Sequence, residues 1–139
     1  MILLDTSGLL AALDPDQDDH EAAAASLAVA EPPLLLSPFV LAELEYLVRR
    51  EAGQCAQLEL LEEVAAHVYE LESFGPADID EARAIVSDYR DLRISLADAS
   101  VVVLARRYGS HDILTLDERH FRVLPGPRGP YRLLPADGH

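Results

Sequence analysis

The sequence predicts an α/β fold in which helices cover both faces of a mostly parallel sheet. Short apolar runs typical of buried strands alternate with longer segments of helical periodicity. The chain has 139 residues, half of them hydrophobic, which is the size of one domain with its own core. We therefore expect a single domain that spans residues 1–139.

The first half of the chain alternates between expected strands and helices. Met1–Leu4 is apolar and ends abruptly at Asp5, as buried strands do. A helix follows at Thr6–Leu13, and a second at Asp18–Ala30 has an acidic first turn that suits the helix dipole. Ser37 and Pro38 then provide an N-cap and a first helical position. The remaining expected elements of this half are a strand at Leu34–Leu36, a helix from Pro38 to about Glu51, and a helix from Gln54 to about Ala66.

The second half continues the alternation. Val68–Phe74 alternates between polar and apolar residues, which predicts a strand, and a helix follows over Ala77–Tyr89. Ser95 and Asp98 have the spacing of a capping box, which opens a helix that ends at Gly109. The last expected elements are a strand at Ile113–Leu116, a helical turn at Asp117–Phe121 and a strand at Tyr131–Leu134.

Charge and composition restrict the function. Acidic residues outnumber basic ones by 25 to 11, every basic residue is Arg, and the net charge is −14. Such a chain repels polyanions at long range, so a nucleic-acid substrate requires cations at the site. No apolar run approaches the roughly 20 residues that cross a bilayer, the N-terminus lacks signal-peptide features, and one cysteine cannot form an internal disulfide. We expect a cytoplasmic protein without membrane association.

Two aspartates directly follow apolar strands. Asp5 and Asp117 would both lie at the carboxyl ends of parallel strands, where open α/β sheets bind their ligands. The alternative is that each one simply caps the helix that follows it.

Two further acids lie in helices with apolar faces. Glu43 lies on or beside the stripe formed by Val40, Leu44 and Leu47, and burying a lone carboxylate is costly unless it is paired or binds a metal. A boundary Glu that reaches solvent is the alternative. Asp98 is the only acid of an otherwise almost wholly apolar helix, although its capping box also explains it locally.

Convergence of these acids at one sheet edge would require cations. Oxygen ligands of this kind suit Mg²⁺, or Mn²⁺, and such ions activate water for in-line attack on phosphorus. We expect the metal to be held by Asp5, Glu43, Asp98 and Asp117. Hydroxyl groups that could orient the acids belong to Thr6, Ser7 and Thr115, although such residues often only cap or turn.

Four motifs along the chain carry a family resemblance. They are Ile2–Ser7, Ser37–Leu44, Leu96–Ala105 and Leu114–Phe121. Together they resemble the PIN-domain nucleases and, more narrowly, the VapC-type toxins of bacterial toxin–antitoxin pairs. The acids of the family pattern fall on Asp5, Glu43, Asp98 and Asp117.

The resemblance implies a three-layer α/β/α sandwich with a mostly parallel central sheet, formed by one PIN-like nuclease domain over residues 1–139. It also implies a Mg²⁺-dependent endoribonuclease, a homodimer, and inhibition by a cognate antitoxin protein. The alternative is a catalytically silent PIN-like module that only binds proteins. Neither the resemblance nor the residues name the RNA that is cut.

The arginines suggest how RNA reaches so acidic a chain. Arg93 precedes the Asp98 helix and Arg119 follows Asp117, so both are expected to bind phosphate at the rim of the site, where an antitoxin would also bind. The alternative is that the arginines pair with surface acids. His120 has no zinc-ligand spacing, and we expect it to have a surface or packing role; the alternative is that it touches RNA, because it lies near Asp117.

The helices at Ala22–Ala30 and Leu58–Ala66 are candidate dimer surfaces, unless their apolar stripes belong to the core.

Overall fold

The computed structural model describes residues 1–138, in which strands and helices alternate along the chain. The strands are β1 (Ile2–Leu4), β2 (Leu34–Leu36), β3 (Glu70–Leu71), β4 (Asp112–Leu114) and β5 (Arg132–Leu134). The helices are α1 (Thr6–Leu13), α2 (His20–Val29), α3 (Pro38–Ala52), α4 (Gln54–Ala65), α5 (Pro76–Asp88), α6 (Leu96–Tyr108) and α7 (Glu118–Phe121), with a 3₁₀ turn η1 (Arg90–Leu92) before α6.

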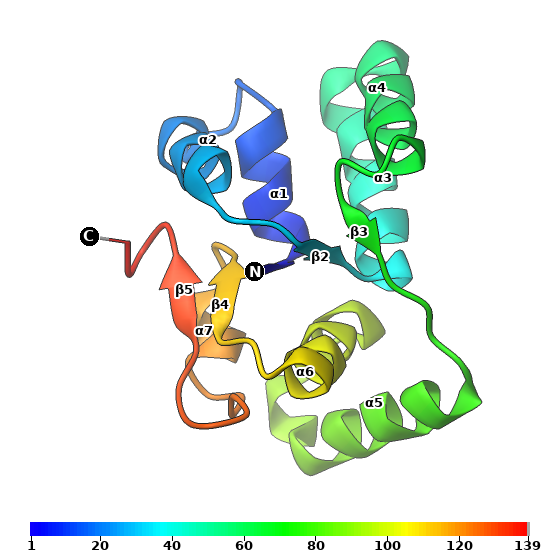
Figure 1. Ribbon diagram of the computed structural model, residues 1–139, viewed down its shortest axis with the longest axis vertical. Helices are drawn as coiled ribbons and strands as arrows, with labels where there is room; N and C mark the ends of the chain where they lie inside the picture. Colours follow the sequence, from blue (N-terminus) through cyan, green and yellow to red (C-terminus); the bar gives the residue numbers. More distant parts are fainter. Residues whose placement is uncertain (139) are drawn as a thin grey trace.

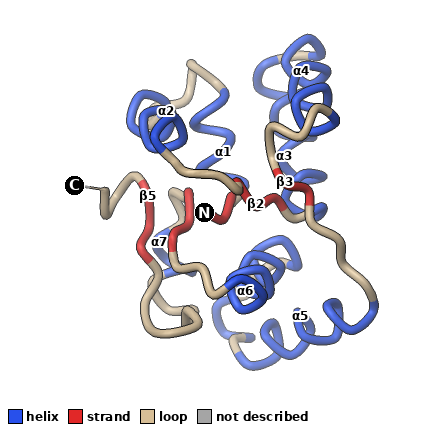
Figure 2. Tube along the Cα trace, viewed as in Figure 1, coloured by secondary structure: helices blue, strands red, loops and turns tan. Residues whose placement is uncertain are grey.

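The strands form one sheet in the order β3-β2-β1-β4-β5, and every neighbouring pair is parallel. Figure 1 shows α1 to α4 on one side of this sheet and α5 and α6 on the other, and Figure 2 traces the same layers. The three-layer α/β/α prediction is therefore confirmed. Because all strands run in one direction, their carboxyl ends meet at one edge of the sheet.

The core lies between the central strands and the helices that cover them. Leu3, Leu35 and Ile113 occupy neighbouring strands and are almost fully buried. Helix α6 is buried along most of its length because it packs against β1, α3 and α5. This explains why its sequence is apolar on nearly every side.

A glycine allows α1 to lie directly against β4. A Cβ atom built on Gly8 would lie 2.3 Å from the carbonyl oxygen of Leu114, which no side chain tolerates. The close approach places Ser7 beside Thr115, although 108 residues separate them in sequence. The first turn of α1 and the end of β4 thus form one structural unit.

The expected strand at Val68–Phe74 is largely wrong. Only Glu70–Leu71 pairs, and both residues are exposed. As an edge strand, this segment has β2 as its only neighbour, so pairing ends where the chain turns away. The buried residues here are Tyr69 and Glu72. The Glu72 backbone N–H still donates to the Leu36 carbonyl oxygen of β2 at 2.9 Å, and its side chain accepts from Arg107 and Tyr108.

None of the helices within residues 1–138 is both long enough and apolar enough to cross a membrane.

Candidate active site

Asp5 lies at the carboxyl end of β1 and is only 3% exposed. Its side chain does not cap α1. The carboxylate instead accepts a hydrogen bond of 2.6 Å from the Thr115 hydroxyl and one of 3.1 Å from the Ser7 hydroxyl. The capping alternative therefore does not account for this buried acid.

The same hydroxyl groups connect the first turn of α1 to the loop that follows β4. The Thr115 hydroxyl oxygen accepts from the backbone N–H of Asp117 at 2.9 Å, and that of Ser7 accepts from the N–H of Leu116 at 3.0 Å. The position of Asp117 is thereby fixed relative to Asp5. The Thr6 hydroxyl, by contrast, is buried and has no hydrogen-bond partner among the described residues.

The surroundings of Asp5 make its ionised form costly. The pKa of Asp5 is raised from 3.8 to about 6, mainly by burial; the hydrogen bond from Thr115 opposes the rise and the nearby charge of Asp98 adds to it. A carboxylate in this position gains stability from a cation, which removes much of the penalty of ionisation.

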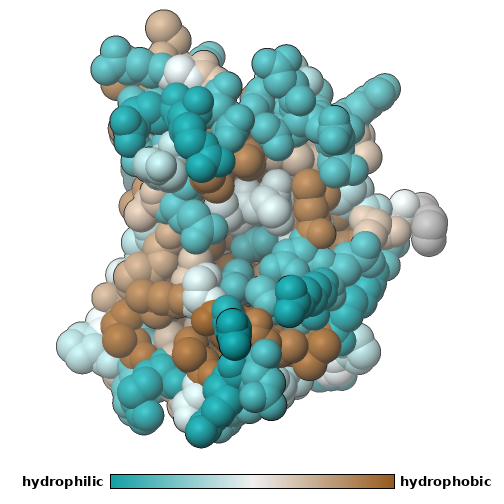
Figure 3. Space-filling view, turned by 180° about the vertical axis from the view of Figure 1, so that it is seen from behind, coloured by the Kyte–Doolittle hydropathy of each residue, from teal (hydrophilic) through white to brown (hydrophobic). Residues whose placement is uncertain are grey.

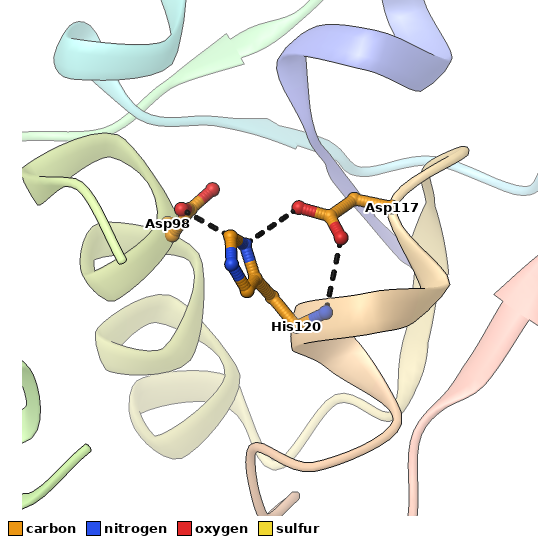
Figure 4. A group of neighbouring side chains, drawn as sticks. All are labelled: Asp98, Asp117 and His120. Carbon is orange, nitrogen blue, oxygen red and sulfur yellow. Dashed lines mark hydrogen bonds and ion pairs between the residues drawn. The ribbon is translucent and has the colours of Figure 1, made fainter. Parts of the chain in front are cut away.

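Asp98 and Asp117 both cap helices and also face each other across the site. Asp98 and Ser95 form the predicted capping box, with reciprocal hydrogen bonds of 3.1 Å. One oxygen of Asp117 accepts from the His120 backbone N–H at 3.0 Å, which caps α7. Capping thus holds both carboxylates in place and leaves oxygens facing the space between α6 and α7 (Figure 4).

His120 lies between these two carboxylates. Its Nδ1 atom is 2.8 Å from Asp117 Oδ2 and 3.6 Å from Asp98 Oδ2, and the side chain is 18% exposed. Sequence reasoning therefore missed that His120 belongs to this cluster. The signal in the sequence was its position three residues after Asp117, one helical turn along.

Glu43 is exposed, so of the two alternatives for its position the structure agrees with a boundary Glu that reaches solvent. Helix α3 buries Val40, Leu44 and Val48, and Glu43 lies outside that stripe. Its side chain makes no hydrogen bond or ion pair within residues 1–138. Thr115 links Asp5 to Asp117, and His120 lies between Asp117 and Asp98, whose charge also acts on Asp5. Glu43 takes part in none of these contacts.

Within residues 1–138, two of the eleven arginine side chains have no polar partner, those of Arg93 and Arg119. Both are exposed. The other nine form hydrogen bonds or ion pairs, as Arg122 does with Glu118. Pairing with surface acids therefore explains most of the arginines but not these two, which lie close in sequence to Asp98 and Asp117.

The donors of this cluster fit a divalent cation. One ligand atom each from Asp98, Asp117 and His120 lies within 4.8 Å of the others. The Nδ1 atom of His120 is buried without a hydrogen-bond partner, so its lone pair is available to a metal ion. Two carboxylates and the nearby Asp5 supply the negative charge that such a cation neutralises.

The fold and this carboxylate cluster define the class of protein, and the comparisons agree. The PIN domain matches residues 2–126. Over 135 residues the chain is 44% identical to Ribonuclease VapC26 of Mycobacterium tuberculosis (strain ATCC 25618 / H37Rv), covering 96% of this chain and 100% of that protein. The chain therefore belongs to the PIN-domain family and, within it, to the VapC ribonucleases.

Two solved structures share the fold. One is Mycobacterium tuberculosis VapC20, described as a Sarcin-Ricin loop cleaving toxin, with a TM-score of 0.78, 22% identity, and coverage of 84% of this chain and 90% of that one. The other is VapBC2 from Rickettsia felis bound to a DNA fragment from its promoter, with a TM-score of 0.66, 18% identity, and coverage of 96% and 98%.

Proposed function

We propose that this protein is a Mg²⁺-dependent endoribonuclease that acts as the toxin of a type II toxin–antitoxin pair. The observation that carries the proposal is the cluster at the sheet edge. Asp98 and Asp117 face the same small space beside the buried Asp5, in a chain that belongs to the VapC ribonucleases. Carboxylates held this close are costly unless a cation binds them.

In this proposal Asp5, Asp98 and Asp117 are the metal ligands, and Glu43 completes the acidic set from α3. When bound, Mg²⁺ neutralises these charges and activates water for in-line attack at the phosphorus of RNA. Asp5 is held for this task because the Thr115 and Ser7 hydroxyls both donate to its carboxylate. The Thr6 hydroxyl is buried next to Asp5 in the chain and remains available to a ligand.

RNA reaches this acidic site through the two unpaired arginines. Arg93 and Arg119 are exposed, have no competing carboxylate within residues 1–138, and lie close in sequence to the acids. The planar guanidinium group binds two phosphate oxygens at once, so each side chain can hold the RNA backbone. Few such contacts oppose a net charge of −14, and we therefore expect modest affinity.

A cognate antitoxin would inhibit the toxin by covering the same arginine rim and acidic site. We propose that residues 1–139 work as one nuclease domain, in the cytoplasm, as a homodimer. Large apolar side chains stay exposed on several elements, including Leu58, Ile79 and Leu96. Figure 3 shows hydrophobic surface gathered in the lower half of the rear face, which suits contact with a second protein chain.

The decisive experiment is RNA cleavage by the purified protein in Mg²⁺, compared with Asp98→Asn and with Asp88→Asn as a matched control. Asp88 is exposed at the end of α5, and its side chain has no polar partner within residues 1–138. We expect cleavage by the wild type and by Asp88→Asn, loss of cleavage in Asp98→Asn, and loss in all three when EDTA is present. Equal cleavage by the wild type and Asp98→Asn would refute the assignment of the site.

A second test uses inducible expression in bacteria. Growth arrest with discrete RNA fragments is expected for the wild type, and relief of both for Asp5→Asn. Harmlessness of both proteins at equal abundance would instead favour a module that only binds proteins.

A further inference from the structure

The side chain of His120 places a nitrogen atom where an oxygen-only metal site would have none. Nδ1 lies 2.8 Å from Asp117 Oδ2 and 3.6 Å from Asp98 Oδ2 (Figure 4). Adjacent ligands of an octahedral ion, each about 2.1 Å from the metal, are about 3.0 Å apart. The two distances from Nδ1 lie on either side of this value, and all three ligand atoms lie within 4.8 Å of one another, close enough to share one ion.

The orientation of the ring agrees with this spacing. Although Asp117 Oδ2 is within 2.8 Å, Nδ1 has no contact with the geometry of a hydrogen bond. Ligands of one ion are directed at the ion and not at each other, which produces short contacts of this kind. The atom is also buried, so water does not satisfy it either.

The two carboxylates are held in position by groups other than His120 Nδ1. Asp98 Oδ2 accepts from the backbone N–H of Ser95, and Asp117 Oδ1 accepts from the backbone N–H of His120. Both acids are thus oriented before any ion binds. The imidazole of His120 is carried by the same helical turn that Asp117 caps, so its distance from Asp117 is fixed by local structure.

We propose that His120 Nδ1 is a metal ligand, and that this nitrogen makes the site prefer Mn²⁺ to Mg²⁺. The inference rests on the proposed function, because it concerns the cation of the same site. Imidazole suits transition metals, whereas Mg²⁺ takes carboxylate, carbonyl and water oxygens. The alternative is that the His120 side chain is not a ligand. It would then be protonated, balance the charge of the two aspartates, and move out of the site when an ion binds.

The test measures Mn²⁺ and Mg²⁺ affinity by calorimetry for the wild type, His120→Asn and His120→Ala, with His67→Asn as the control. His67 is exposed, its side chain has no polar partner within residues 1–138, and it has a left-handed backbone that Asn accepts. We expect both His120 variants to weaken Mn²⁺ binding by about 10- to 100-fold, with a much smaller change for Mg²⁺. The control should match the wild type for both ions.

Electron spin echo spectroscopy of bound Mn²⁺ gives an independent readout, because a coordinated nitrogen modulates the echo. We expect this modulation in the wild type and in His67→Asn, and its absence in the His120 variants, whose folding is checked by circular dichroism. Binding of Mn²⁺ without nitrogen modulation in the wild type would overturn the inference and leave the proposed nuclease intact. Failure of the wild type to bind either ion would overturn the proposed function as well.

Discussion

Replacing Asp5 with Asn should stabilise the metal-free protein at neutral pH. The pKa of this buried carboxyl is raised from 3.8 to about 6, with burial as the main cause. The folded state therefore holds the proton more tightly than the unfolded state does. Its contribution to stability is fully present below about pH 4 and is lost as the pH rises through 6.

The magnitude follows from the two pKa values. One pKa unit corresponds to about 1.4 kcal/mol, so a shift from 3.8 to about 6 corresponds to about 3 kcal/mol of lost stability at pH 8. Asn has the size of Asp and keeps an oxygen that can accept from Thr115, but it never ionises. We expect Asp5→Asn to exceed the wild type by up to about 3 kcal/mol at pH 8, a rise in Tm on the order of 10 °C.

The assay is thermal and urea unfolding in EDTA from pH 4 to pH 8. The advantage of Asp5→Asn should shrink to about 0.5 kcal/mol by pH 4, where Asp5 is protonated in the folded state and partly protonated in the unfolded state. Asp88→Asn, which replaces an exposed acid, should stay within about 0.5 kcal/mol of the wild type throughout. Adding Mg²⁺ at pH 8 should stabilise the wild type and narrow the gap. A gap that does not depend on pH would refute the reasoning.

Three further predictions concern the surroundings of the site. Thr115→Val removes the hydroxyl that donates to Asp5 and accepts from the Asp117 N–H, so urea unfolding should show a loss of about 1–3 kcal/mol; unchanged stability would contradict the network. Gly8→Ala should lose about 3 kcal/mol or more because its Cβ would meet the Leu114 carbonyl at 2.3 Å, whereas Gly75→Ala, with only Asp78 Oδ2 at 4.0 Å, should lose less than about 1 kcal/mol. In Ca²⁺, Arg93→Ala and Arg119→Ala should each weaken RNA binding and reduce the slope of log affinity against log salt by about 1. Arg83→Ala, which removes an arginine paired with Asp80, should change neither the affinity nor the slope. An unchanged slope in both Arg93→Ala and Arg119→Ala would show that RNA binds elsewhere on the protein.

The parts of the fold that the sequence predicts well depend on neighbouring residues. The helix at Thr6–Leu13 and the strand at Leu34–Leu36 are confirmed to the residue. The capping box of Ser95 and Asp98 is confirmed as well. Such features are readable because a cap, a turn or an apolar run involves groups only a few positions apart.

Features that depend on contacts between residues distant in sequence could not be predicted from the sequence. The edge position of β3 shortened the expected strand at Val68–Phe74, and the packing of α3 left Glu43 exposed. Whether an arginine side chain is paired depends on where the surface acids lie in the folded chain. Only the structure therefore shows that the side chains of Arg93 and Arg119 have no partner within residues 1–138.

By itself, the sequence determined that aspartates follow the apolar strands and open the helices of a parallel α/β domain, because strand ends and caps are local features. The tertiary structure alone decided what surrounds those acids. It buried Asp5 beneath two hydroxyl groups and placed His120 between Asp98 and Asp117. The physical reason is that the pKa of an acid and the ligands available to a cation depend on desolvation and on charges a few ångströms away, which residues remote in sequence supply.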